Sequence, residues 1–353
     1  MCHLAGYVGE QNAVPKIIES LRVQEGIIGS QATGLAVITN SKVKMEKDIG
    51  PVSNFEEQFS LKDFESTIGI GHTRYALKNI TKAETNTKEK AHPFWSSKKN
   101  FVTMHNGTIS NYLEFVEKLE EKGYSFKSKS VFVDKETQSE VTDFCDSEIF
   151  GYQLEEELKN TGDIKQAIKQ ACENIRGHFA FVVLHPDFPE TIFIANWMQP
   201  IHIGTSSNSA FFSSFANGIE PFSDRCCWAY QPMKNSLITL TKKQVNIEKL
   251  VSSRELPEYK PNNRQLEKVV LDAIDNGNHN LPSTLVYLMG HLDKIQMTTE
   301  EFEKLSTVEG YTFTPALYQA LENLETEGKI QRKLDYVWEG GIDKTPRFNF
   351  YRV

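Results

Sequence analysis

The sequence predicts an α+β protein in which sheets pack face to face with helices outside, followed by a small helical, winged-helix-like domain. Short apolar runs typical of strands alternate with stretches of helical periodicity over the first two thirds of the chain, and this alternation suits layered sheets and helices. Pro257, Pro261 and neighbouring asparagines mark a linker at residues 252–262. The 353 residues are enough for one domain at 1–251 and a second at 263–353.

In the first domain, Val14, Ile17, Ile18 and Leu21 recur at helical spacing and predict a helix over residues 14–23. A loop bounded by glycines at residues 26–34 then leads into a strand. Strands are expected at 35–38, 67–71, 101–104, 179–184, 191–195, 201–204, 210–215 and 236–240, and further helices at 54–64, 111–122, 147–159 and 164–175. The charged, Ser/Thr-rich stretch at 127–142 predicts a surface hairpin or a mobile insert.

In the second domain, short helices are expected at 264–276, 282–293, 299–304 and 315–328, and a strand pair at 329–338 and 347–352. This order resembles a winged helix. A DNA-binding version needs a basic recognition helix, but residues 315–328 carry Glu322, Glu325 and Glu327 and no lysine or arginine. The sequence therefore predicts a protein-interaction or self-association domain whose removal leaves the chemistry of the first domain intact.

Net charge, apolar runs and cysteine spacing exclude several classes of function. A net charge of −8 gives no broad attraction to nucleic acid or to an anionic membrane, and neither a signal-peptide pattern nor a membrane-spanning apolar run is present. The cysteines are odd in number, scattered and without zinc spacing: Cys2, Cys145, Cys172, Cys226 and Cys227. We expect a cytoplasmic protein without a metal or cofactor, in which Cys145, Cys226 and Cys227 are packing residues.

Cys2 directly follows the initiator methionine. Removal of Met1 would place a thiol and a free α-amine on one residue. The thiolate is the nucleophilic form of cysteine, and an amine with a pKa of roughly 7.7–8.0 can take its proton near neutral pH. The ordinary alternative is a small buried cysteine at the start of a strand.

Polar clusters follow predicted strands at His72–Tyr75, at His105–Gly107 and at Asp146. Strand ends are where rigid scaffolds present catalytic groups. Each cluster alone has an ordinary explanation: Arg74 as a surface ion pair, Asn106-Gly107 as a turn and Asp146 as a helix start. We expect His72, His92 and His105 to be structural, hydrogen-bonded residues.

Taken together, these motifs resemble a known family. The Cys2 start, Gly71–Ala76, His105–Gly107 and Asp146–Glu148 occur in the order and approximate spacing of class II glutamine amidotransferase domains, which are N-terminal-nucleophile hydrolases. The chain most resembles the glutaminase domains of glucosamine-6-phosphate synthase and amidophosphoribosyltransferase, from Cys2 to about Leu250.

The resemblance implies a four-layer αββα fold and assigns roles. Cys2 would attack the side-chain amide of L-glutamine, and Asn106 and Gly107 would form the oxyanion hole. Arg74 would hold the substrate α-carboxylate, Asp146 the α-ammonium group, and Tyr75 would also contact the substrate. The family mechanism needs no histidine.

The resemblance also implies a glutaminase that supplies ammonia to an acceptor on another chain. Two alternatives stay open: a non-catalytic scaffold of the same fold, and a stand-alone amidohydrolase acting on a γ-glutamyl amide. Several positions depart from the family pattern, namely His3 in place of glycine, Ile27 and Ile28 in a loop that often carries arginine, and Leu77-Lys78-Asn79 after the arginine cluster.

Overall fold

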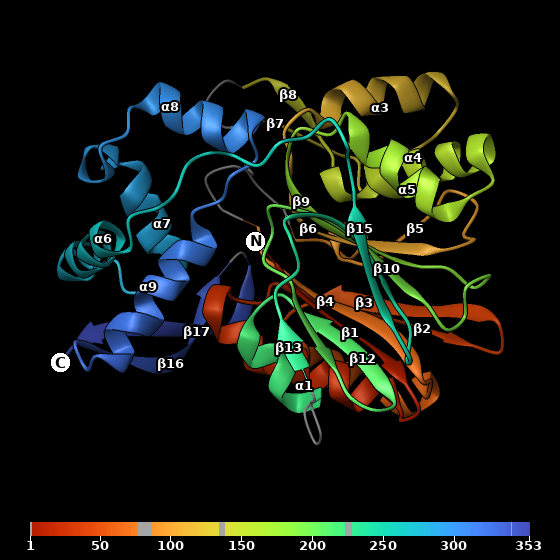
Figure 1. The fold of residues 1–353 in the computed structure, drawn as a ribbon, viewed down its shortest axis with the longest axis horizontal. Coiled ribbons are helices and arrows are strands. Elements are labelled where there is room, and N and C mark those ends of the chain that lie inside the picture. The colour runs from red at the N-terminus through yellow and green to blue at the C-terminus, as the bar shows by residue number, and fades with distance from the viewer. Residues whose placement is uncertain (1, 77–85, 134–137, 223–227, 340) are drawn as a thin grey trace.

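The computed structural model describes residues 2–76, 86–133, 138–222, 228–339 and 341–353. Cys226, Cys227 and Leu77-Lys78-Asn79 lie outside these ranges. Within them, two large antiparallel sheets stack face to face (Figure 1). The α+β prediction is therefore confirmed.

The first sheet has the order β13-β11-β12-β1-β4-β2-β3. Its strands are β1 (His3–Gly9), β2 (Ala32–Thr39), β3 (Lys42–Ile49), β4 (Ile68–Arg74), β11 (His202–Thr205), β12 (Ser209–Ser213) and β13 (Trp228–Tyr230). Every residue of β1 is buried, because β1 pairs with β4 on one side and with β12 on the other. The start of the chain is thus the centre of this sheet.

The second sheet has the order β15-β14-β10-β9-β6-β5. Its strands are β5 (Phe94–Trp95), β6 (Val102–Ile109), β9 (Gly177–Leu184), β10 (Ile192–Trp197), β14 (Asn235–Leu240) and β15 (Val245–Lys249). Leu4 and Ile70 of the first sheet and Val182 and Ile194 of the second belong to one buried apolar cluster. Burial of this shared surface holds the two sheets together.

Helices cover the outer faces (Figure 1). On the first sheet lie α1 (Ala13–Ile28), α2 (Val52–Gln58) and the short 3₁₀ turns η1 (Leu61–Phe64) and η3 (Ala216–Phe222), and on the second lie α3 (Tyr112–Glu121), α4 (Asp146–Thr161) and α5 (Ile164–Glu173). Another 3₁₀ turn, η2 (Lys88–Lys90), precedes β5. The predicted surface hairpin at 127–142 is confirmed as β7 (Ser130–Val133) paired with β8 (Glu140–Asp143).

Two sequence-based boundaries were wrong in an informative way. The helix expected at 14–23 begins after the N-cap Asn12 and continues to Ile28, so half of the expected loop at 26–34 is the end of α1 or its cap. The strand expected to stop at residue 104 continues to Ile109, because β6 pairs with β9 along its whole length. Asn106-Gly107 is therefore within a strand and is not a turn.

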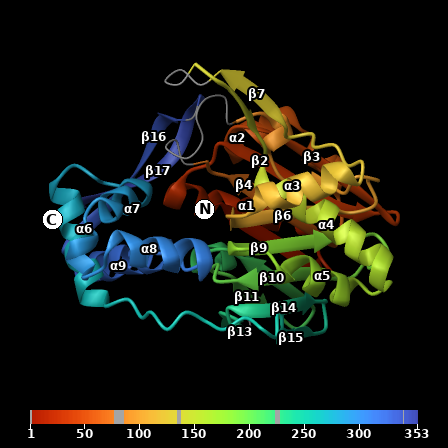
Figure 2. The ribbon, with the colours of Figure 1, turned by 90° about the horizontal axis from the view of Figure 1, so that it is seen from above.

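Residues 263–353 form a module of helices followed by a β-hairpin (Figure 1). Its elements are α6 (Asn263–Asp275), α7 (Leu281–Met289), η4 (Leu292–Ile295), α8 (Thr299–Glu303), η5 (Lys304–Val308), α9 (Thr314–Thr326), β16 (Ile330–Glu339) and β17 (Ile342–Arg352). Residues 252–262, without helix or strand, lead to α6 along one face of the molecule (Figure 2). The winged-helix assignment and the domain division stay predictions.

The module does not stand apart from the sheets. Its apolar core includes four buried residues of the first 251, namely Ile27, Ile28, Tyr75 and Phe215. β17 packs against α1, and Phe215 meets Tyr318 of α9 edge to face at 5.1 Å. Packing therefore crosses the predicted domain boundary, and it does so beside Tyr75.

Candidate active site

Cys2 lies at the start of β1, where strands from both sheets meet. Its backbone N–H donates to Asn106 Oδ1 of β6 at 2.8 Å, and its Sγ accepts from the backbone N–H of Tyr75 at 3.4 Å. The residue is only 8% exposed. The pairing of His3 with Thr73 brings the end of β4 alongside the nucleophile, so three of the predicted motifs converge on one thiol.

Gly107 occupies a position that only glycine fits. Its φ is +138°, and a Cβ there would lie 2.0 Å from the carbonyl oxygen of His178 on β9. Residues other than glycine rarely adopt such a backbone conformation. The glycine lets β6 stay paired with β9 through the segment that carries Asn106.

Asp146 is the first residue of α4, as the sequence predicts. Its Oδ2 accepts from the backbone N–H of Ile109 at 2.9 Å, and its Oδ1 accepts from the hydroxyl of Ser147 at 3.2 Å. Its side chain is 24% exposed. The carboxylate is thereby fixed at the end of β6 while one side still faces the solvent.

A cavity of about 290 Å³ lies beside Cys2 and Asn106, which are not among its lining residues. Arg74, Tyr75, Gly107 and Asp146 all contribute to its wall. Its other lining residues are Ala76, Lys90, Thr108, Ile109, Ser110, Tyr112, Asp143, Phe144 and Cys145. The volume is near the lower end for small-molecule sites, and the wall contains both a guanidinium and a carboxylate.

Sequence reasoning missed Lys90 and Asp143 in this wall. Lys90 is 2% exposed, and its Nζ lies 2.6 Å from Asp143 Oδ2 and 2.9 Å from Ser130 Oγ. The pair fastens the β7–β8 hairpin to the rim of the cavity. A lysine at the end of a polar stretch is expected to be exposed to solvent, so nothing in the neighbouring sequence indicates that Lys90 is buried.

The histidines near the site are neutral and mainly structural. Burial lowers the pKa of His3 to about 3 and the pKa of His105 to about 4, and holds the pKa values of His72 and His92 well below their usual range. His72 Nε2 bonds the carbonyl oxygen of His105 at 3.0 Å, and His105 Nδ1 bonds Ser147 Oγ at 2.9 Å.

His92 corrects the expectation of hydrogen bonding. Neither of its ring nitrogens has a hydrogen-bond partner among the residues that the structure describes. Its ring instead stacks on that of His72, with centroids 3.9 Å apart, and meets Phe94 edge-on. The aromatic character of His92, and not its polarity, holds it in place.

The other described cysteines lack a reactive setting. Cys145 and Cys172 are buried and unpaired, and burial raises the pKa of both thiols. No group of three or more potential metal ligands is found in the described ranges. In the same ranges, every helix is too short or too polar to cross a membrane.

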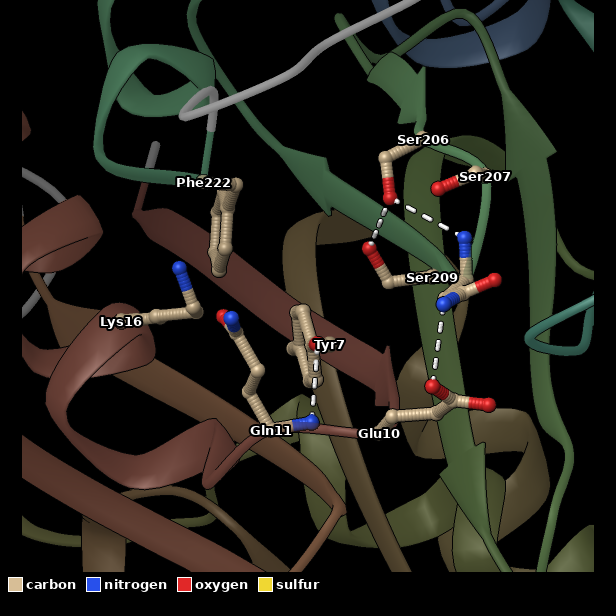
Figure 3. A pocket seen from close by; sticks show the side chains of 9 residues that line it. Tyr7, Glu10, Gln11, Lys16, Ser206, Ser207, Ser209 and Phe222 are labelled. Atoms are coloured by element: carbon tan, nitrogen blue, oxygen red, sulfur yellow. Dashed lines mark hydrogen bonds between the residues drawn. The ribbon is translucent and has the colours of Figure 1, made fainter.

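A larger cavity, about 420 Å³, lies at the opposite end of β1 (Figure 3). Tyr7, Gln11, Ser206 and Ser209 are among its lining residues, and the hydroxyl of Tyr7 accepts from the backbone N–H of Gln11 at 3.3 Å (Figure 3). Its described lining contains no cysteine or histidine. The smaller cavity beside Cys2 is therefore the candidate active site.

Comparison with known proteins agrees with this geometry. A model of the glutamine amidotransferase domain matches residues 78–220. This segment is similar to glutamine amidotransferase domains. The resemblance seen in the sequence motifs is thereby confirmed.

The curated relatives of this amidotransferase domain are longer proteins. The chain is 29% identical over 279 residues to a glutamine–fructose-6-phosphate aminotransferase (isomerizing) of Thermus thermophilus, covering 78% of this chain and 41% of the relative. It is 33% identical over 228 residues to the protein of that name from Bacteroides thetaiotaomicron, covering 64% and 34%. The chain thus spans less than half the length of these relatives.

A solved structure shares the fold. Glutamine phosphoribosylpyrophosphate amidotransferase from B. subtilis superposes with a TM-score of 0.58 at 17% identity, covering 77% of this chain and 58% of that one. At this identity the similarity concerns the fold alone.

Proposed function

We propose that the chain hydrolyses the side-chain amide of glutamine through a thioester on Cys2 and supplies the ammonia to an acceptor on another chain. One observation carries the proposal: the Cys2 thiol contacts Tyr75, and Tyr75, Arg74 and Asp146 line the same cavity. A nucleophile is therefore adjacent to a pocket whose wall carries Arg74 and Asp146 besides the paired Lys90 and Asp143. Arg74 and Asp146 supply the positive and the negative side chain that an amino acid substrate requires.

Arg74 and Asp146 would hold the amino-acid end of glutamine. A guanidinium binds a carboxylate through two parallel hydrogen bonds, and the Nη1 of Arg74 is oriented by Asn86 Oδ1 at 2.6 Å. Asp146, held by the Ile109 N–H, would receive the α-ammonium group. Binding at these two points would leave the side-chain amide free to extend toward Cys2.

The chemistry would proceed in two steps. The Cys2 thiolate forms a bond to the amide carbon, the resulting tetrahedral oxyanion collapses, and the carbon–nitrogen bond breaks to release ammonia. Water then hydrolyses the glutamyl thioester to glutamate. After removal of Met1, the α-amine of Cys2 would accept the thiol proton and pass it to the leaving nitrogen. Asn106 Oδ1, 2.8 Å from the Cys2 nitrogen, would hold that amine in place.

Asn106 and Gly107 would stabilise the oxyanion through the side-chain amide and the backbone N–H. Removing one such donor typically costs about 2.7–4 kcal/mol of transition-state stabilisation. The glycine-only conformation of residue 107 supports a role that depends on the position of the backbone.

Features outside the cavity bear on the acceptor, the donor and the compartment. Residues 263–353 form helices and a hairpin that pack beside the candidate site. A module of this kind supports an ammonia acceptor that is a separate chain and binds next to the site. The relatives named as aminotransferases use glutamine by name, which supports L-glutamine as the donor. The unpaired Cys145 and Cys172 fit the reducing cytoplasm.

The test is ammonia and glutamate release from glutamine, with asparagine and a γ-glutamyl amide as comparison substrates. Wild-type protein whose intact mass shows loss of Met1 should be active, and Cys2→Ala should be inactive. Undiminished hydrolysis by Cys2→Ala, or by protein that retains Met1, would contradict the mechanism. Glutamine binding without turnover would favour the scaffold, and preference for the γ-glutamyl amide would favour the stand-alone amidohydrolase.

A further inference from the structure

The hairpin of the C-terminal module reaches the residue that contacts the nucleophile. The hydroxyl of Tyr75 donates to Glu339 Oε1 of β16 at 3.2 Å, and the guanidinium of Arg347 on β17 lies over the Tyr75 ring, 5.1 Å from its centroid. Arg347 and Glu339 also form an ion pair. The side chain of Tyr75 is therefore held by a pair of residues more than 260 positions away in the chain.

The backbone of the same residue contacts Cys2. The Tyr75 N–H donates to the thiol Sγ at 3.4 Å, and the Sγ also lies 3.8 Å from the Tyr75 carbonyl oxygen. Gln31 holds the segment from the other side, because its N–H donates to the Arg74 carbonyl oxygen at 2.8 Å and its Oε1 accepts from the Ala76 N–H at 2.9 Å. One short segment thus carries the contact from the hairpin to the thiol.

Burial makes the ion pair well suited to fix a position. The side chain of Arg347 is 3% exposed and that of Glu339 is 19% exposed. Arg347 also approaches the end of α1 closely, since a Cβ on Gly29 would lie 2.5 Å from its Nη2. Burial raises the pKa of Tyr75 to about 12, so its hydroxyl stays protonated and donates to Glu339 at neutral pH.

We infer that Glu339 and Arg347 are positioning residues for the nucleophile, acting through the side chain and backbone of Tyr75. The inference rests on the proposed function for its catalytic readout, although the geometry of the thiol can be probed without catalysis. The hairpin then has a second role besides any docking: it holds Tyr75, a residue in the wall of the candidate cavity.

The test uses full-length protein with Glu339→Gln, Arg347→Lys and Tyr75→Phe. The first removes the charge, the second keeps the charge but loses the planar fork, and the third removes only the hydroxyl. Each should lower kcat for glutamine by about tenfold to a hundredfold, the scale expected when a reacting group is misplaced, with a smaller change in KM. The rate of Cys2 alkylation by iodoacetamide, followed by peptide mass across pH, should change in all three.

Arg352→Gln is the matched control. Arg352 is in the same strand and pairs with Asp275 at 2.6 Å, but both side chains are exposed, so kcat and alkylation should stay at wild-type values. If Glu339→Gln does not fold, Arg347→Lys and Tyr75→Phe decide the question. A double Glu339→Gln/Arg347→Lys variant should lose no more kcat than the worse single variant, because both act through one pair.

Two results separate the possible failures. Folded variants that keep wild-type kcat and a wild-type alkylation profile would overturn the positioning role. Wild-type protein that releases no ammonia from glutamine would overturn the proposed function instead. In that case a changed Cys2 alkylation profile in the variants would still support positioning, and an unchanged profile would remove it.

Discussion

The carboxylate of Asp146 accepts a hydrogen bond from the backbone N–H of Ile109 at 2.9 Å. This contact ties the first residue of α4 to the last residue of β6, the strand that also carries Asn106 and Gly107. The proposed ammonium acceptor and the proposed oxyanion donors are thus positioned by one strand. A displacement of β6 would therefore move the proposed substrate-binding carboxylate and the proposed oxyanion donors together.

Asp146→Asn should therefore weaken glutamine binding. The amide can still accept from Ile109 but carries no charge for an ammonium group, and hydrogen bonds to charged groups contribute about 1.5–3 kcal/mol. KM should rise by roughly tenfold to a hundredfold, with a smaller effect on kcat. Asp163→Asn is the matched control, because Asp163 caps the neighbouring helix α5. Equal KM values in the two variants would exclude the role of Asp146.

Arg74→Lys tests the other end of the substrate. Lysine keeps the charge but cannot form two parallel hydrogen bonds to a carboxylate. We expect KM for glutamine to rise by about tenfold or more. Steady-state kinetics with glutamine provide the measurement, and an unchanged KM would show that the carboxylate is held elsewhere.

Gly107→Ala should destabilise the fold as well as the site. The new Cβ would overlap the His178 carbonyl oxygen at a φ of +138°, so we expect a loss of at least about 3 kcal/mol in the free energy of unfolding. Gly123 is a matched control, since its φ is +86° but nothing lies within 4 Å of a Cβ there. Gly123→Ala should cost only about 1 kcal/mol. Similar losses in denaturant unfolding would argue against the close approach of β9.

Acid should destabilise the protein below about pH 6.5. An unfolded histidine binds a proton near that pH, whereas buried His105 does so only near pH 4 and the pKa of His92 is also far below the usual value. The unfolded state then binds more protons, and stability falls as the pH drops. His92→Phe removes one such group without losing a hydrogen bond to any described residue. Below about pH 6.5, the free energy of unfolding of His92→Phe should change with pH less steeply than that of the wild type, by about 1.4 kcal/mol per pH unit.

Removal of residues 263–353 should not leave an intact glutaminase, contrary to the expectation from sequence. Ile27, Ile28, Tyr75 and Phe215 would lose their cover, and exposed apolar surface destabilises the fold and promotes aggregation. We expect the fragment 1–262 to unfold at a lower denaturant concentration and to lose most of its glutaminase activity. A fragment with full-length stability and kcat would show that the contact is dispensable.

The sequence located the polar wall of the site because its residues follow strands in a recognisable order. Cys2, Arg74, Tyr75, Asn106, Gly107 and Asp146 all contact or line one small region. The local environment of Asn106-Gly107 was mispredicted because turn propensity was outweighed by pairing along β9. The pairing of β6 with β9 thus outweighs the turn preference of the Asn-Gly dipeptide.

Other features had no local signal. The burial of Lys90 depends on Asp143, in a hairpin 53 positions later. The contact of Glu339 with Tyr75 joins residues 264 positions apart. Neither pair shows a periodicity or a motif, so only the folded chain reveals them.

The placement of β17 against α1 also has a consequence for biosynthesis. The ribosome makes Cys2 and β1 before the C-terminal module, and residues 342–352 emerge more than 330 positions after β1. Ile27 and Ile28 lack their native neighbours throughout that interval. A nascent chain therefore carries Cys2 long before Tyr75 is held, and under the proposed positioning role its thiol reaches its native setting only after the second strand of the hairpin has been translated.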